Sequence, residues 1–209
     1  MTEEIKKNKY WEKYYDSLNS NMPPSQFAAF CCIELLHQNV AQLIEIASGE
    51  GRDSIFFAQQ GIQTIALDRS LSAVTLINKK IPKNSNLRVK QIDVINEDLP
   101  QPINSNEVCA FYARFFIHTL DEDQLTKFFD NLASSMRKND LFFTEYRNDN
   151  DADLEKVTPD HYRNFFNENY VKRIANQYGL NCEYEVSGRG YAKWNVDDAF
   201  VTRQIFIKL

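Results

Sequence analysis

The sequence contains little of several residue types, and each shortage excludes a class of protein. Its 209 residues include six glycines, four cysteines and three histidines. No apolar run reaches the about 18 residues that a membrane-spanning helix needs, so we expect no membrane span. The first residues lack the apolar core of a signal peptide, which predicts a soluble, cytoplasmic protein. The net charge of −5 disfavours a general binder of phosphate backbones, so we expect no nucleic-acid partner.

The cysteines do not have the spacing of a zinc site. Cys31 and Cys32 are adjacent, and adjacent cysteines cannot easily ligate the same metal ion. Cys109 and Cys182 stand alone in the sequence. We therefore expect buried free thiols and no metal site.

Apolar runs and helical segments alternate along most of the chain. The length and the 43% apolar content suit a single domain over residues 1–209. Strands are expected at residues 41–48, 62–68, 87–94, 107–115, 140–147, 180–188 and 199–209, and helices at 51–60, 70–80, 121–138 and 159–179. This order predicts an α/β fold with a Rossmann-like, seven-stranded, mostly parallel sheet, an antiparallel last strand and helices on both faces. Ligands bind such sheets at the carboxyl ends of the strands.

The loop in "EIASGEGRDS", residues 45–54, is the first candidate for a ligand site. Gly49 and Gly51 allow a positive φ and a close approach of the backbone to a ligand, and Ser48 lies between a strand and a helix start. Glu45 would repel a phosphate group, and no lysine follows as in a phosphate-binding P-loop. The acid instead suits a ligand with a cationic or hydrogen-donating end. At Ala47 we expect a negative φ, because the residue is not glycine.

Two further acids end the next two strands. Asp68 is placed to accept hydrogen bonds from both hydroxyls of a ribose. Asp93 is placed to accept from an exocyclic amine, while the backbone N–H of Val94 meets a ring nitrogen. Together with Glu45, these residues describe a ligand with an amino group, a ribose and an aminated base, which are the parts of S-adenosylmethionine (SAM). A nicotinamide dehydrogenase is the rival reading, but Ser54 stands where its third glycine would be.

The same motif resembles the first motif of the class I SAM-dependent methyltransferases, with Ala47 in place of the first glycine. The continuation "GRDS" is similar to that of small-molecule methyltransferases of the tellurite-resistance and thiopurine type. Asp68 and Asp93 fall where that family makes its ribose and adenine contacts. The resemblance implies a SAM-dependent methyltransferase with S-adenosylhomocysteine (SAH) as product. We expect Trp11, Arg69 and Arg114 to complete the cofactor site.

The segment "FYARFFIHTLDEDQ", residues 111–124, ends the fourth strand, where a methyl acceptor would approach. His118 is a candidate general base, because the usual histidine pKa of about 6.5 suits proton removal near neutrality. Its alternative role is structural, joining this loop to the next helix. Glu145 and His161 are the other two candidate bases.

Four arginines follow the strand ends predicted to face the acceptor, namely Arg114, Arg147, Arg163 and Arg189. If they converge, they form an anion pocket, because the planar guanidinium binds two oxygens at once. Alternatively, each is a surface residue or pairs locally. The stretches "ARFF", "TEYR", "HYRNFF" and "SGRGYAKW" resemble class I enzymes of surface-polysaccharide and phosphoryl-sugar pathways. The number of arginines favours O-methylation of a small anionic or phosphorylated acceptor, linked to a sugar or a nucleotide, and we expect Tyr15 and His161 to contact it as well.

The N-terminal residues 1–38 are expected to form a helical lid. Tyr10, Trp11, Tyr14 and Tyr15 share one face of the first helix, which either docks on the core or covers the cofactor and acceptor. Two other functions stay open, a SAM-binding regulator without catalysis and a methyltransferase acting on protein or RNA. We expect a monomer or a homodimer.

Overall fold

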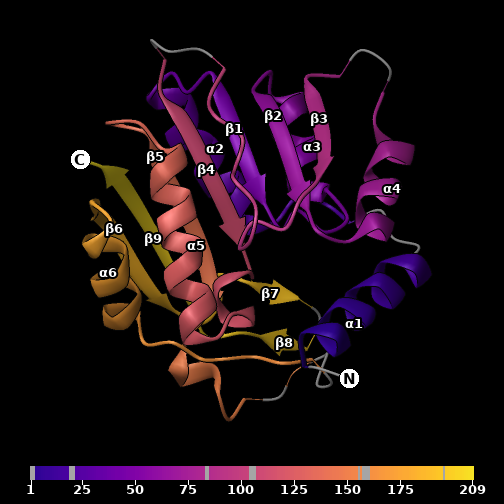
Figure 1. Ribbon diagram of the computed structural model, residues 1–209, viewed down its shortest axis with the longest axis vertical. Coiled ribbons are helices and arrows are strands. Elements are labelled where there is room, and N and C mark those ends of the chain that lie inside the picture. The colour runs from indigo at the N-terminus through magenta and orange to yellow at the C-terminus, as the bar shows by residue number, and fades with distance from the viewer. Residues whose placement is uncertain are drawn as a thin grey trace.

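The computed structural model describes residues 3–18, 22–82, 85–103, 107–154, 156, 161–194 and 196–209, with side chains from residue 9 onward (Figure 1). The helices are α1 Glu3–Ser17, α2 Gln26–His37, α3 Arg52–Gln59, α4 Leu71–Lys80, α5 Glu122–Ser135 and α6 Glu168–Gln177, with short 3-10 turns at Ile117–Thr119 and Asp149–Asp151. The strands are β1 Gln42–Ile46, β2 Gln63–Asp68, β3 Leu87–Gln91, β4 Cys109–Arg114, β5 Leu141–Arg147, β6 Leu180–Gly188, β7 Lys193–Trp194, β8 Asp197–Asp198 and β9 Val201–Lys208.

One seven-stranded sheet, in the order β3-β2-β1-β4-β5-β9-β6, forms the centre of the molecule. Strands β1 to β5 pair in parallel, and β9 runs antiparallel to both of its neighbours, β5 and β6. The predicted fold class is therefore confirmed. The chain moves outward from β1 to β3 on one side and from β4 to β5 on the other. This reversal opens a crevice at the carboxyl ends of β1 and β4.

Strand residues alternate between two apolar cores, one on each face of the sheet. Ile44, Phe111 and Phe142 pack in the core that contains the apolar residues of α5 and α6. Leu43 and Phe143 pack in the opposite core with α2 and α3 (Figure 1). Helices on both faces thus bury the sheet and leave its carboxyl edge to carry the polar groups.

Helix α2 belongs to the body of the domain. Phe27, Cys31 and Leu35 have 0% of their surface exposed. Ser25 caps the helix, and its hydroxyl oxygen accepts from the N–H of Ala28 at 3.0 Å. The lid expected over residues 1–38 therefore reduces to α1, which lies apart from this core (Figure 1).

The helix predicted at residues 159–179 is shorter than expected. Helix α6 begins at Glu168, where the side chain of Asn167 caps the first turn. Residues 161–167 are irregular, and the predicted start at Pro159 lies outside the described residues. The Asn167 cap explains the late start, because an N-cap residue has a non-helical backbone.

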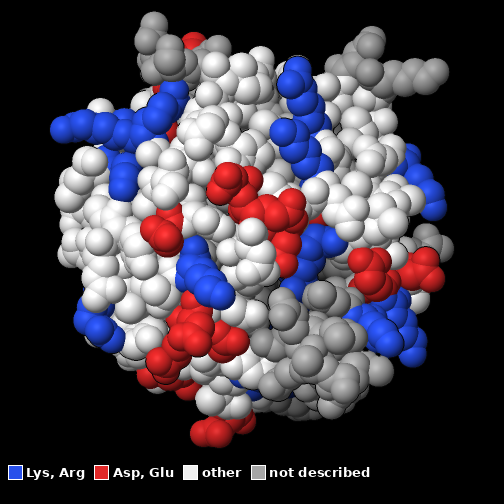
Figure 2. All heavy atoms as spheres, in the orientation of Figure 1, with Lys and Arg blue, Asp and Glu red and all other residues white. Residues whose placement is uncertain are grey.

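Three of the four cysteines are buried free thiols as predicted, whereas Cys182 is half-exposed. Among the described helices, none is both long and apolar enough to cross a membrane. On the face in Figure 2, acidic and basic side chains are interspersed.

Candidate functional site

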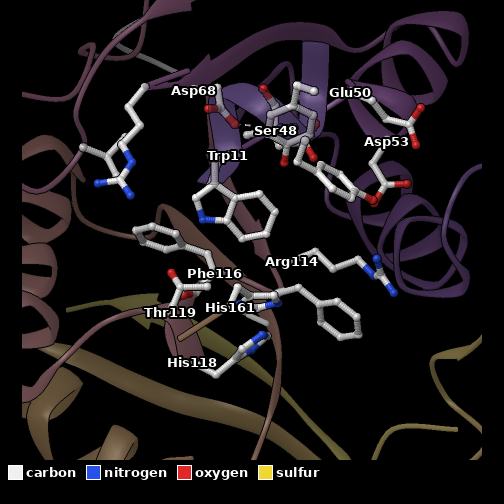
Figure 3. A pocket seen from close by; sticks show the side chains of 18 of the residues that line it. Trp11, Ser48, Glu50, Asp53, Asp68, Arg114, Phe116, His118, Thr119 and His161 are labelled. Carbon is white, nitrogen blue, oxygen red and sulfur yellow. Dashed lines mark hydrogen bonds between the residues drawn. The ribbon is translucent and has the colours of Figure 1, made fainter. Parts of the chain in front are cut away.

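A pocket of about 350 Å³ opens at the carboxyl ends of β1, β2 and β4, and α1 lies across it. This volume is in the range of small-molecule sites. Figure 3 shows Asp53 and Asp68 along one wall and His118 with His161 on the opposite side, with Trp11 between them. The sheet order explains this division, because the acids follow β1 and β2 while His118 follows β4.

Most of the predicted site residues line this pocket. They are Trp11, Tyr15, Glu45, Ala47, Ser48, Gly49, Asp68, Arg69, Asp93, Val94, Arg114, His118, Arg147, His161 and Arg163. The other three predicted residues, Gly51, Glu145 and Arg189, are not among the residues that form its walls. The lining residues that were not predicted include the polar or aromatic side chains of Arg52, Asp53, Trp194 and Asp197. Arg52 and Asp53 belong to the same "GRDS" motif, so the motif itself was the signal for them.

The backbone of Ala47 is left-handed, with φ of 53°. The expected negative φ is therefore wrong. The strand ends at Ile46, and the N–H of Ser48 already donates to the carbonyl of Leu67 at 2.9 Å. This hydrogen bond to the neighbouring strand holds the abrupt turn, so a non-glycine residue is kept in a conformation that L-residues disfavour.

Substitutions at Ala47 test this geometry. For Ala47→Gly we expect the unfolding free energy to stay within about 1 kcal/mol of the parent value. The variant gains about 1–2 kcal/mol because glycine adopts the left-handed backbone without strain. It loses a similar amount because a methyl group is removed and the unfolded chain with glycine has more conformational freedom. For Ala47→Val we expect a loss of about 2 kcal/mol, because a β-branched residue tolerates positive φ poorly. Urea unfolding measures both, and a valine variant as stable as the parent would contradict the left-handed turn.

Gly49 and Gly51 both have positive φ, as predicted, but they serve different contacts. A Cβ at Gly49 would lie 2.7 Å from the hydroxyl of Tyr15, so this glycine lets α1 approach the loop. A Cβ at Gly51 would lie 2.7 Å from a side-chain carbon of Ile77. Gly51 therefore packs α3 against α4 and is not placed as the cofactor contact that the sequence suggested.

Asp68 is held rigidly at the end of β2. Its carboxylate accepts from the N–H of Gly49 at 2.8 Å and from the N–H of Ser70 at 2.9 Å. Burial raises its pKa, and these two hydrogen bonds oppose that effect. Each carboxylate oxygen has more than one lone pair, so the side chain can still accept hydrogen bonds from a ligand in the pocket.

Glu45 and Asp53 form a buried acidic wall. The hydroxyl of Ser54 donates to Glu45, and Asp53 accepts from Tyr112 at 2.8 Å and from Ser25 at 2.7 Å. Burial, and then the nearby charge of Asp53, raise the pKa of Glu45 well above its usual range. A cationic ligand group would relieve this cost and favour the ionised form.

The residues at the carboxyl ends of β1, β2 and β3 fit SAM. The hydroxyl of Ser48 lines the pocket, is buried and has no hydrogen-bond partner within the described part of the chain. A buried polar group of this kind requires a partner, which a bound ligand can supply. Asp93, which follows β3, also lines the pocket. Its carboxylate accepts from the backbone N–H of Ile95 at 3.1 Å.

Glu145 lies outside the pocket and is not placed to act as a base. It is fully buried and accepts from Arg114 Nε and Arg203 Nε, each at 2.8 Å. A carboxylate held by two guanidinium groups is a structural ion pair. The prediction that Glu145 abstracts a proton is therefore corrected.

Arg147 is also compensated by neighbouring acids. Its guanidinium donates to Asp151 at 2.7 Å and to Asp197. The fourth predicted arginine, Arg189, is exposed and pairs with Asp198 at 3.6 Å, outside the pocket walls. The predicted convergence therefore holds for Arg114, Arg147 and Arg163 in position, but Arg114 and Arg147 share their charge with buried carboxylates.

The two pocket histidines have opposite hydrogen-bonding roles. His118 Nδ1 accepts from the backbone N–H of Arg147 at 3.3 Å, which places its proton on Nε2 and makes that nitrogen a donor. His161 Nδ1 lies 3.0 Å from the carbonyl of Tyr162 and donates to it, which leaves Nε2 as an acceptor. Only His161 thus offers a basic nitrogen.

Both imidazoles are neutral near pH 7. Burial, and then the charge of Arg147, hold the pKa of His118 well below its usual range. Burial, and then Arg163, lower the pKa of His161 to about 4. The expectation of a histidine that titrates near neutrality is therefore not met, because both rings are buried and lie beside arginines.

This geometry is that of a Rossmann-like α/β fold with a pocket at the carboxyl edge of its sheet, one wall of which is acidic. Residues 43–139 match the family described as a methyltransferase domain. No curated protein matches the chain. The match covers the part of the chain that carries the cofactor loop, and the fold resembles that of the class I SAM-dependent methyltransferases.

Several solved structures share the fold. One is the magnesium protoporphyrin IX methyltransferase of Synechocystis PCC 6803 with bound SAH, at TM-score 0.73 and 11% identity over 100% of both chains. A second is a SAM-dependent methyltransferase from Clostridium acetobutylicum, at TM-score 0.70 and 12% identity over 97% of this chain and 99% of that one. A third is a TehB-like methyltransferase from Corynebacterium glutamicum, at TM-score 0.68 and 11% identity over 99% of this chain and 100% of that one.

Proposed function

We propose that this methyltransferase transfers a methyl group to an oxygen of a small, negatively charged acceptor. The observation that carries the proposal is the gathering of arginines at the β5 side of the pocket. Arg114, Arg147 and Arg163 line it there, where Arg114 pairs with Glu145 and Arg147 pairs with Asp151 and Asp197. The protein as a whole has a net charge of −5, so this gathering of cationic side chains is local.

The depressed histidine pKa values support the same reading. Burial is the larger cause of both shifts, and beyond it the charges of Arg147 and Arg163 each lower the pKa of His118 and of His161. A region that disfavours a protonated imidazole favours an anion by the same electrostatic potential. The opposite wall carries Glu45, Asp53 and Asp68, so the pocket has an acidic cofactor side and a basic acceptor side.

Asp197 favours an acceptor that also carries a hydrogen-bond donor. It lines the pocket from β8 and receives Arg147 on one oxygen, while its other oxygen is buried and has no hydrogen-bond partner among the described residues. An acceptor with a hydroxyl or N–H group would satisfy that oxygen. A hydroxylated anion such as a sugar phosphate or a nucleotide has both features.

Bound SAM supplies a methyl group on a cationic sulfur, which is already activated for displacement. Glu45, Ser48 and Asp68 would hold it, and α1 would exclude water from the site. The chain's remaining task is to align the acceptor. A phosphate or carboxylate oxygen needs no base, whereas a hydroxyl would lose its proton to His161 Nε2.

Incubation with SAM and pairs of sugar phosphates and their uncharged parents tests the proposal, with methylated product detected by mass spectrometry. We expect product from charged members only. For Arg163→Gln we expect the KM of the charged acceptor to rise about tenfold or more, the value of a charge-assisted hydrogen bond. Arg189→Gln is the matched control, because Arg189 lies outside the pocket, and its KM should not change. Equal kcat/KM for charged and uncharged acceptors would refute the anionic acceptor.

A further inference from the structure

Helix α1 is attached to the domain through a carboxylate that caps another helix. Glu12 accepts from the backbone N–H of Leu71 at 2.8 Å and from that of Ser72 at 3.0 Å. These are the first two residues of α4, where backbone N–H groups have no partner inside the helix. The negative charge also suits the N-terminal end of the helix dipole. Glu12 therefore supplies, from α1, two of the hydrogen bonds that an N-terminal cap provides.

The hydrogen bonds are strong enough to affect ionisation. Burial disfavours the charged form of Glu12, but the hydrogen bonds from Ser72, Leu71 and Ser70 outweigh it and lower the pKa of the carboxyl group. The carboxylate is thus ionised and engaged at neutral pH.

The capped turn is the same turn that carries the proposed ribose contact. The N–H of Ser70, one residue before α4, donates to Asp68 at 2.9 Å. Trp11, the neighbour of Glu12, lines the cofactor pocket and stacks on Tyr15 with ring centroids 5.8 Å apart. The hydroxyl of Tyr15 reaches Gly49 in the cofactor loop. Anchoring α1 at Glu12 therefore sets Trp11 and Tyr15 over the site, and Figure 3 shows Trp11 there.

The same helix also reaches the acceptor side. The ring of Trp11 lies 5.0 Å from that of His161, and the ring of Tyr10 lies 5.6 Å from it. Between Lys9 and Ser17, every side chain is exposed or half-buried and none is fully buried. An element that adds no fully buried apolar side chain to the core belongs to the less stable parts of a structure.

We propose that Glu12 is the latch of a cofactor lid: its two hydrogen bonds to the start of α4 hold α1 closed over the SAM pocket, and the cofactor enters and leaves when they break. The proposal rests on the cofactor site and not on the identity of the acceptor. Glu12 is a positioning residue, since it acts through Trp11 and Tyr15.

Two variants break the latch from opposite sides. Glu12→Gln removes the charge and one of the two oxygen acceptors. Leu71→Pro removes one of the two N–H donors and leaves α1 unchanged. Proline is favoured at the first position of a helix, and Ser70 before it already has an extended backbone with ψ of 121°. The side chain of Leu71 is 57% exposed, so its loss empties no core. Asp16→Asn is the matched control, because it removes an exposed acid from the same helix.

The measurement is the dissociation rate of SAH, followed by stopped-flow tryptophan fluorescence on the whole chain. We expect the rate to rise about tenfold in Glu12→Gln and in Leu71→Pro, the scale of a lost helix cap, and to stay at the parent value in Asp16→Asn. If the two substitutions acted independently, the SAH dissociation rate of the double variant would rise by the product of the two single fold-increases. Because both break one latch, we expect a smaller rise than that product. Trypsin cleavage after Lys13, with and without SAH, reports lid opening independently, and SAH should protect the parent more than the variants.

A merely structural role would lower the melting temperature of both variants and leave the SAH dissociation rate within twofold of the parent. That result overturns the latch and leaves the cofactor site intact. A parent protein that does not bind SAH overturns the cofactor site and the latch together.

Discussion

Replacement of Asp68 with alanine is expected to weaken SAH binding by about a hundredfold, since the variant loses charge-assisted hydrogen bonds to a ligand and a fixed loop. Asp68 is 6% exposed, lines the pocket and joins the backbone of Gly49 to that of Ser70. Without the carboxylate, both N–H groups lose their partner, and the loop that carries Gly49 is no longer tied to the start of α4. Isothermal titration calorimetry with SAH measures the loss.

Asp68→Asn separates the two contributions. The amide keeps one acceptor oxygen and the shape of the side chain, so we expect a loss of about tenfold, as for one weakened hydrogen bond. Asp98→Asn, which removes an exposed acid outside the pocket walls, is the control for net charge. Circular dichroism establishes that each variant is folded. An alanine variant with parent-like SAH affinity would show that the ribose assignment is wrong.

Local signals in the sequence were sufficient to predict most of the fold. The strands are continuous apolar runs because they are covered on both faces, and β1, β4 and β5 have almost every residue buried. Ser70 caps α4, at the start of the helix expected over residues 70–80, because a serine before an apolar helix offers its oxygen to the first free N–H groups. The acids at the strand ends reach the pocket because parallel strands bring their carboxyl ends to one edge.

Pairings between distant residues could not be predicted in this way. Glu145 and Arg203 lie 58 residues apart in the chain and meet only because β9 pairs with β5. The same is true of Arg147 and Asp197, which lie 50 residues apart. A single sequence indicates that these side chains are polar, but the sheet order decides which charges neutralise each other. The roles given to the arginines and to Glu145 changed for that reason.

The error at Ala47 has a related cause. Residue type alone favours a negative φ, but the turn after β1 is held by Ser48 and the neighbouring strand. Helices α1 and α2 also look similar as helical segments, yet α2 carries buried apolar residues such as Phe27 and Leu35. In α1 the aromatic residues face a pocket, which a helical pattern cannot distinguish from a core.

The largest loss of stability is expected for Glu145→Gln. The carboxylate has 0% of its surface exposed and receives Arg114 and Arg203, each at 2.8 Å. A neutral amide would leave two guanidinium groups without their counter-charge in a buried setting. Breaking such a pair from one side costs about 3–5 kcal/mol, which is a large part of the stability of a typical domain. Urea unfolding followed by circular dichroism measures the change.

The exposed ion pair between Lys172 and Glu185, at 3.0 Å, is the matched comparison for this buried one. Lys172→Met should cost less than about 1 kcal/mol, because solvent screens the pair. The comparison also separates the two roles considered for Glu145. A catalytic base replaced by glutamine would leave the unfolding free energy nearly unchanged and abolish turnover. A structural ion pair lowers the unfolding free energy first, and the folded fraction that remains still binds SAH, because Glu145 does not line the pocket.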